Sequence, residues 1–266
     1  MLLIFSPVKI MAQGNLMITP RRVILEGQKR TEELNLANAG KDTARYLISM
    51  MEIRMKNDGT FEKITQPDSG QNFASTHIRF FPRSVILAPG EAQAIKIQVT
   101  KPAELQTGEY RSHMYFRAVP DETPLGEATP VKDSSAISVR LVPIFGISIP
   151  VIVRVGECAA HVNISDVSLE TPRDSAAGLR MMFNRSGNMS VYGDIKIDFI
   201  STQGKIIQAG TVKGVAVYTP ASSRLIRINL DKIPGINYHS GKLHIIYTTP
   251  TDDKPVKIAE TELVLH

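Results

Sequence analysis

The chain has 266 residues, of which 42% are hydrophobic, with 18 Gly, 16 Pro and no Trp. This length allows one large or two ordinary domains, and the composition favours an all-β protein with many turns over a helical bundle or a disordered chain. The formal net charge is +5, but the basic residues are scattered and no run exceeds two, which argues against a nucleic-acid-binding protein.

Residues 1–14 are apolar and short, with a small-residue boundary near Ala12. They resemble the second half of a secretory signal, although a basic first region is missing and Pro7 and Lys9 interrupt the run. We therefore expect a truncated signal segment, with an ordinary N-terminal strand or tail as the alternative. No stretch reaches the roughly 20 apolar residues of a membrane helix without a proline, so we expect no stable membrane insertion.

The first half of the chain reads as short strands separated by turns. Apolar and polar residues alternate, and Gly, Asn, Asp and Pro lie between the alternating stretches. The expected strands lie within 16–26, 31–37, 44–55, 78–87, 92–100 and 108–119. Residues 56–59, Lys-Asn-Asp-Gly, carry a hairpin signature, and the polar stretch from there to Thr76 is expected to be loop. This spacing of strands predicts an immunoglobulin-like β-sandwich.

The stretch 136–155, AISVRLVPIFGISIPVIVRV, is unusually long for a strand, and we expect the first domain to be organised around it. Its β-branched residues favour extended backbone, and its odd positions are apolar apart from Pro143. Pro143 and Pro150 remove backbone donors, which an edge strand tolerates better than a central one. A long apolar edge invites pairing with another chain, so we predict a strand that serves a partner. The preceding residues 120–135 have no period and are expected to form a long loop.

The second half repeats the pattern with shorter strands after a link over 156–160. The expected strands cover 161–169, 179–184, 191–201, 205–209, 213–218, 224–230, 241–248 and 256–265. No helix is required beyond a turn near Pro102. The fold class is therefore predicted as all-β, with two immunoglobulin-like β-sandwich domains in tandem over 15–156 and 157–266.

The sequence contains no pattern typical of catalysis or of a resident cofactor. A nucleophile elbow, a zinc-protease motif, a glycine-rich phosphate loop and a paired-cysteine motif are all absent from it. His113 beside Met114 could suggest a copper site, but neighbours along a strand point to opposite faces and cannot readily share one metal. We therefore expect no enzyme activity, no cofactor and no metal.

Several segments, taken in order, resemble one known family. They are TPRRVILEG, FFPRSVILAPGEAQAIKI, GEYRSHMYFRAVP and VPIFGISIPVIVR, followed in the second half by LRMMFNRSGNMSVYGDI and GVAVYTPASSRLIRINL. In their order and spacing they resemble the periplasmic PapD-like chaperones of pilus and fimbria assembly, as a variant member. The resemblance implies two immunoglobulin-like domains set at an angle, like a boomerang. It also implies that the first domain lends its last strand to a fimbrial subunit that lacks its own final strand.

The resemblance further implies a set of subunit-binding residues. Arg22 matches the basic residue that anchors the terminal carboxylate of the subunit, and guanidinium is chemically suited to that pairing. The family's second anchor, a lysine, falls on Ser148, or on Pro150 if the alignment slides by two, and neither residue is basic. The donor positions fall on Ile137, Val139 and Leu141.

The function that follows is a periplasmic chaperone that stabilises secreted, β-rich pilus or fimbrial subunits by donor-strand complementation. Its partners would be these subunits and an outer-membrane usher, without nucleic acid. The alternative is a two-module immunoglobulin-like protein with a structural or surface-interaction role and no chaperone activity, because such folds host many functions.

Overall fold

The computed structural model describes residues 16–120, 144–170, 177–236, 238–250 and 254–265. Strands dominate these residues, and the described part of the chain has only two helical turns, the 3₁₀ helices η1 (Ser75–His77) and η2 (Pro102–Glu104). The predicted all-β class, built from β-sandwiches, is confirmed. No helix in the described ranges is long and apolar enough to cross a membrane.

The described residues form two compact units, neither of which is one continuous stretch of chain. Among the described residues, the first unit draws on 16–51, 74–103, 111–120 and 144–153. The second draws on Glu52–Phe73, Glu104–Tyr110 and the described residues from Arg154 onward.

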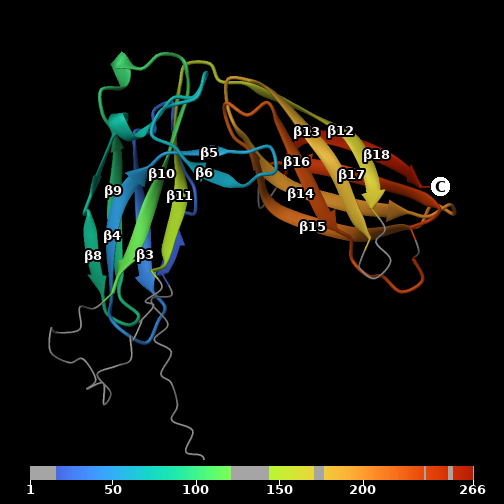
Figure 1. Cartoon of the computed structure of the whole chain (residues 1–266), viewed down its shortest axis with the longest axis horizontal. Helices are drawn as coiled ribbons and strands as arrows, with labels where there is room; N and C mark the ends of the chain where they lie inside the picture. Colours follow the sequence, from blue (N-terminus) through green and yellow to red (C-terminus); the bar gives the residue numbers. More distant parts are fainter. Residues whose placement is uncertain (1–15, 121–143, 171–176, 237, 251–253, 266) are drawn as a thin grey trace, which may run out of the picture. The chain divides into compact units, whose positions relative to one another are not determined.

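The first unit is a sandwich of two sheets (Figure 1). One sheet has the order β1 (Leu16–Thr19), β3 (Thr31–Asn38), β9 (Ala92–Val99), β7 (Ile78–Phe81). The other has the order β2 (Val23–Glu26), β11 (Gly146–Val155), β10 (Gly108–Val119), β4 (Ala44–Met51), β8 (Ser84–Leu87). Side chains alternate between the two faces of each strand, so every second residue enters the shared core.

The alternation of β9 illustrates how the sequence produces this core. Ile95, Ile97 and Val99 are buried, whereas the polar Lys96 and Gln98 between them are exposed. The opposite sheet supplies Met114 and Phe116 from β10 to the same core, both at most 1% exposed. In this strand, the alternation of apolar and polar residues in the sequence therefore corresponds to the alternation of buried and exposed side chains.

The strand expected over 136–155 differs from its prediction in two respects. Within the described residues it begins at Gly146, and the expected residues 136–143 lie outside them. It is also not an edge strand, because β11 lies between β2 and β10 in the sheet. The physical reason is that β2, which has four residues against the ten of β11, covers that edge, and the one backbone donor lost at Pro150 does not prevent the pairing.

The hairpin predicted at Lys56–Gly59 is confirmed. It joins β5 (Ile53–Met55) to β6 (Phe61–Lys63), which pair antiparallel. The single strand expected over 44–55 is wrong, because the chain leaves β4 at Met51 and starts β5 at Ile53. The loop expected up to Thr76 is also partly wrong, because β6 closes the hairpin, which belongs to the second unit.

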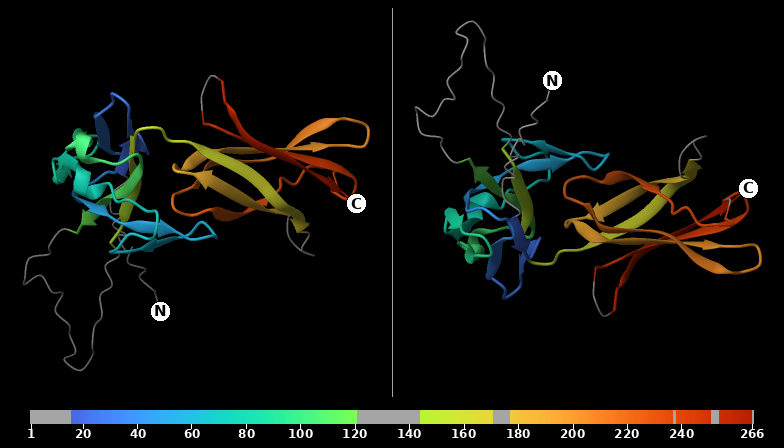
Figure 2. Two further views of the ribbon diagram at one scale, coloured as in Figure 1. Left: turned by 90° about the horizontal axis from the view of Figure 1, so that it is seen from above. Right: turned by 90° about the horizontal axis from the view of Figure 1, so that it is seen from below.

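The second unit contains the other sandwich, which Figure 2 shows from two further directions. One sheet has the order β12 (Ala160–Glu170), β13 (Gly178–Gly187), β16 (Ser223–Asn229). The other has the order β15 (Ile206–Val217), β14 (Val191–Ile200), β17 (Gly241–Thr248), β18 (Lys257–Leu265). The two strands expected at 205–209 and 213–218 are one strand, β15, because shifts in its register with β14 absorb the irregularity between them.

Aromatic rings form the centre of the second core. The rings of Phe183 and Tyr247 meet edge to face, with centroids 5.0 Å apart, and those of Phe199 and Tyr238 do so at 5.7 Å. The Tyr247 hydroxyl donates a hydrogen bond of 2.8 Å to the carbonyl of Val215. The centre of the core thus consists of packed aromatic rings, and the Tyr247 hydroxyl within it has a hydrogen-bond partner.

Replacing Phe183 with Ala should lower the free energy of unfolding of the second unit by about 3–5 kcal/mol, because Phe183 is fully buried. Phe81→Ala is the matched control: Phe81 is 76% exposed, so its loss should change stability by no more than about 0.5 kcal/mol. Thermal unfolding followed by circular dichroism measures both. Equal effects of the two variants would contradict the assigned core.

Candidate functional site

Three basic side chains gather on one face of the first unit. Arg111 and His113 lie two residues apart on β10, so they point to the same face of the sheet. They are only 1% and 3% exposed. Arg22 lies immediately before β2 and is half-buried, whereas Arg21 is exposed. We call Arg22, Arg111 and His113 the cation cluster.

Hydrogen bonding fixes the form of the imidazole in the cation cluster. Arg111 Nη1 lies 3.4 Å from His113 Nδ1. A guanidinium can only donate, so Nδ1 is the acceptor and the imidazole proton resides on Nε2. Burial lowers the pKa of His113 to about 3, and the positive charges of Arg111 and Arg22 act in the same direction. His113 is therefore a neutral N–H donor at physiological pH.

The cation cluster has the chemistry of a carboxylate site. Guanidinium groups present paired N–H donors that match the two oxygens of a carboxylate, and the neutral imidazole is a second kind of N–H donor. The family resemblance suggested Arg22 as a carboxylate anchor, and it did not include Arg111 or His113. The signal that could have found them is their spacing of two on a predicted strand, which places both on one face.

The other predicted site residues lie on or before β11. Ser148 is exposed on β11. Ile137, Val139 and Leu141 lie outside the described residues. The structure therefore brings Arg22 into a cluster of basic groups that the resemblance did not include.

The N-terminal end of β11 exposes large apolar side chains. Phe145 and Ile147 are 58% and 41% exposed, although Ile149, Val151 and Val153, at alternate positions further along the chain, are at most 4% exposed. A strand places alternate residues on one face, so these five residues form one apolar row. The row is buried towards the C-terminal end of β11 and exposed at the N-terminal end.

Neighbouring contacts hold this exposed end in place. The Ala118 amide of β10 donates a hydrogen bond of 3.0 Å to the carbonyl of Phe145. The ring of Tyr115 occupies the space that a side chain at Gly146 would need, so only glycine fits between the exposed residues. The apolar end is consequently a fixed feature of the sheet.

A second exposed surface lies on the same sheet, over β4, β8 and β10. Arg117 stands opposite Leu47, and Arg45 stands opposite Ile86. Leu47 and Ile86 are 44% and 54% exposed. Neither Arg45 nor Arg117 makes an ion pair with another described residue. This basic-apolar patch, defined by these four residues, is suited to an acidic surface that also carries apolar side chains.

A buried carboxylate lies at the start of β10, inside the second unit. Glu109 Oε2 accepts hydrogen bonds from Arg154 Nε at 3.1 Å and from the Ser190 amide at 3.0 Å. Its Oε1 accepts from the Thr219 hydroxyl at 3.1 Å and from the Ser190 hydroxyl. Its side chain has no exposed surface. With this many donors, the carboxylate is a structural anion rather than a reactive group.

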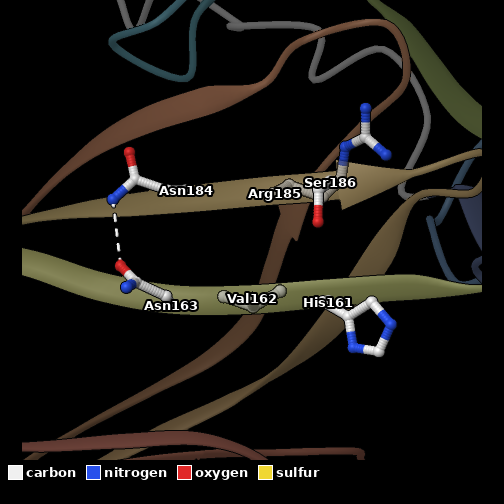
Figure 3. A pocket seen from close by; sticks show the side chains of 6 residues that line it. All are labelled: His161, Val162, Asn163, Asn184, Arg185 and Ser186. Atoms are coloured by element: carbon white, nitrogen blue, oxygen red, sulfur yellow. Dashed lines mark hydrogen bonds between the residues drawn. The ribbon is translucent and has the colours of Figure 1, made fainter.

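The second sandwich carries a shallow groove of about 390 Å³ along β12 and β13 (Figure 3). In it the Asn184 amide donates a 3.2 Å hydrogen bond to Asn163 Oδ1. The Arg185 guanidinium donates to the carbonyls of Ala221, Gly187 and Met189. These polar groups form hydrogen bonds with one another and with backbone carbonyls. Across the described ranges, no group of three His, Cys, Asp or Glu side chains is placed to hold a metal ion.

Comparisons with known proteins give structural neighbours only. No family model and no curated protein matches the sequence. The chain is similar to the CupB2 chaperone of Pseudomonas aeruginosa (12% identity, 94% of this chain and 100% of that chain, TM-score 0.46). It is similar to the CsuC chaperone solved with the CsuE tip adhesion subunit of Csu pili from Acinetobacter baumannii (12%, 92% and 98%, 0.45). It is also similar to the structure of the SafB chaperone with the SafA pilin of Salmonella enterica (13%, 95% and 97%, 0.44).

Each of these solved structures contains a chaperone, and two of them also contain a pilin or a tip adhesion subunit.

The depressed pKa of His113 predicts how stability depends on pH. The unfolded imidazole, with a pKa of about 6.5, binds its proton below that pH, whereas the folded one does not until about pH 3. Stability should therefore fall as pH drops from about 6.5 towards 3, by up to about 1.4 kcal/mol per pH unit. In His113→Gln this contribution should vanish, which denaturant unfolding at several pH values would detect as a shallower pH dependence.

The exposed His161 provides the control for this measurement. His161→Gln should leave the steep pH dependence of the unmodified protein in place. A His113→Gln variant with the same pH dependence as the unmodified protein would show that the imidazole is not buried in its neutral form.

Proposed function

We propose that this protein is a periplasmic chaperone that binds a secreted, β-rich fimbrial or pilus subunit by donor-strand complementation. The observation that carries the proposal is the N-terminal end of β11, where Phe145 and Ile147 continue an apolar row but remain 58% and 41% exposed. The role is binding and stabilisation, not catalysis, and it requires no cofactor.

The physical basis is the behaviour of an incomplete sandwich. A subunit that lacks its last strand exposes a sheet edge and an apolar groove, and it aggregates unless another strand covers both. A donated strand supplies backbone hydrogen bonds to the edge and alternate apolar side chains to the groove. The exposed row on β11 has the alternation that such a groove requires.

The donor positions extend this row towards the N-terminus. Ile137, Val139 and Leu141 have the same odd parity as Phe145 and Ile147. In an extended chain, residues of one parity recur about every 6.6 Å on one face, twice the rise of about 3.3 Å per residue. In our proposal these residues fill the groove of the subunit.

The cation cluster would hold the carboxylate at the C-terminus of the subunit. Arg22 takes the role that the resemblance gives it. Ser148, at the position of the family's second anchor, carries no charge, so in our proposal Arg22 contacts the carboxylate and the buried Arg111 adds positive charge nearby.

The basic-apolar patch supports a second partner. It combines exposed leucine and isoleucine side chains with arginines that have no ion pair within the described sheet. An outer-membrane usher is the partner that the proposed role requires, and it would dock through an acidic and apolar surface. This docking is separate from subunit capture, since the patch and the exposed end of β11 consist of different residues.

Substitutions at and just before the start of β11 test the donor role. Phe145→Ser and Ile147→Ser together should abolish co-purification of a co-expressed fimbrial subunit, while stability changes by no more than about 0.5 kcal/mol per substitution. The same result is expected for Val139→Ser with Leu141→Ser. Val151→Ser is the matched control on the buried part of the row and should destabilise by about 2–5 kcal/mol. Normal capture by the first two double variants would refute the donor role.

Charge removal tests the carboxylate anchor. Arg22→Ala should weaken subunit capture by about 2–5 kcal/mol, because a charge-assisted interaction is lost. Arg21→Ala should have no such effect, since Arg21 is exposed beside it. Isothermal titration with a peptide from the C-terminus of the subunit, free or amidated, separates the contribution of the carboxylate. Equal affinity for both peptides would exclude an anchor for the carboxylate.

A further inference from the structure

The ring of Tyr115 in β10 lies over the backbone of Gly146 in β11, within the first unit. The two strands are neighbours in one sheet and run side by side (Figure 1). A Cβ atom added to Gly146 would lie 2.5 Å from Tyr115 Cζ and would also overlap Cε2 and the hydroxyl oxygen. Real Cβ atoms essentially never approach another atom within 3.0 Å. The ring therefore fills the space that a larger residue at Gly146 would need.

This contact lies on the outer face of the sheet. Met114 and Phe116, the two neighbours of Tyr115 in β10, are buried in the core, so Tyr115 points to the opposite face. In β11 the apolar row occupies the odd positions and continues into the core, so the even position of Gly146 faces the ring. The ring thus supports β11 from behind, while the exposed end of the apolar row projects from the front.

The ring compensates for a weak position in β11. Ser49 of β4 stands directly opposite Tyr115 and remains exposed, whereas the ring covers Gly146 on the other neighbouring strand. A glycine adds no side chain to the packing of a strand and weakens it. An aromatic ring placed across a glycine of the adjacent strand offsets this loss. Tyr115 therefore supplies packing where β11 itself supplies none.

The supported position lies at the less buried end of β11. The first three residues of the strand are exposed, and burial begins only at Ile149. The Ala118 amide donates its 3.0 Å hydrogen bond to the carbonyl of Phe145, directly before Gly146. The ring contact and this hydrogen bond hold the same end of the strand.

We propose that Tyr115 is a positioning residue for the donor strand: its ring pins β11 at Gly146 and so presents Phe145 and Ile147 as a fixed, extended row. This inference rests on the proposed function, because the row matters only when a subunit binds it. A donor that is already extended loses less conformational entropy on pairing than one that must first be ordered. In this role Tyr115 acts through β11 rather than by touching the subunit.

Tyr115→Ala is the test. In the free protein, hydrogen exchange of the Ala118 amide, measured by nuclear magnetic resonance, should become at least about tenfold faster, because its acceptor adjoins the released Gly146. The dissociation constant of the fimbrial subunit that co-purifies with the unmodified protein should rise about tenfold, because the released strand must be ordered on binding. Tyr115→Phe keeps the ring, so both values should stay close to those of the unmodified protein.

The second unit provides a matched control. Tyr192 of β14 is half-buried, like Tyr115, and its hydroxyl oxygen would lie 2.9 Å from a Cβ atom on Gly214 of β15. Tyr192→Ala removes this equivalent contact. Because neither residue of the pair belongs to β10 or β11, the exchange of the Ala118 amide and the affinity for the subunit should remain unchanged.

Gly146→Ala tests the same contact from the other strand. Gly146 is not among the glycines with a positive φ, so alanine fits its backbone and the effect of the substitution comes from the collision with the ring. Gly146→Ala should therefore speed the exchange of the Ala118 amide. The acceleration should be several-fold smaller in the Tyr115→Ala background, where the ring is gone.

The two readouts separate the possible failures. Unchanged exchange of the Ala118 amide in Tyr115→Ala would overturn the pinning of β11. Faster exchange with an unchanged dissociation constant would show that the ring stabilises the sheet without positioning the donor. Weaker capture without faster exchange would mean that Tyr115 contacts the subunit directly, which also overturns the proposal. If the unmodified protein captures no subunit, the proposed function fails and the positioning role fails with it; the exchange measurements need no subunit and so identify this case.

Discussion

The buried carboxylate of Glu109 is the constraint on which much of this structure depends. A carboxylate without exposed surface is stable only when its oxygens are fully supplied with donors. Arg154, Ser190 and Thr219 provide them from three separate parts of the chain. Because these groups fix the start of β10, they also determine to which face of the sheet the side chains of the following β10 residues point.

Strand β10 consequently combines three tasks. Its even positions, such as Met114 and Phe116, fill the first core, while its odd positions carry Glu109, Arg111 and His113. Its far end holds the carbonyl of Phe145 and so positions the exposed end of β11. Core packing, charge and apolar exposure are linked through the period of two along a single strand. A one-residue slip would exchange the two faces and destroy all three features.

Much of this architecture follows from the sequence, and the remainder depends on contacts that a sequence does not display. Alternation predicted strands such as β9, and the Asn-Asp-Gly run predicted the hairpin turn that ends at Gly59. Arg22 was found through a family resemblance. By contrast, Glu109 meets Ser190 and Thr219 across 81 and 110 residues, and no local pattern encodes that pairing. The prediction of β11 as an edge strand failed because β2, which covers that edge, is only four residues long, and so short an alternating stretch does not indicate which strand it pairs with.

The hydrogen bond from the Leu225 amide to Asn57 also bears on solubility and on how the second unit is encoded. β16 is the last strand of its sheet, and a bare strand edge is a template for self-association. The turn of the hairpin between β5 and β6 supplies an acceptor, the carbonyl of Asn57, to one amide of this edge. A second sandwich produced by itself from residue 157 onward would leave the Leu225 amide at this edge without its acceptor and would be more prone to self-association. The second unit is therefore not encoded by one continuous stretch of chain, because it includes Glu52–Phe73 with the hairpin that supplies Asn57.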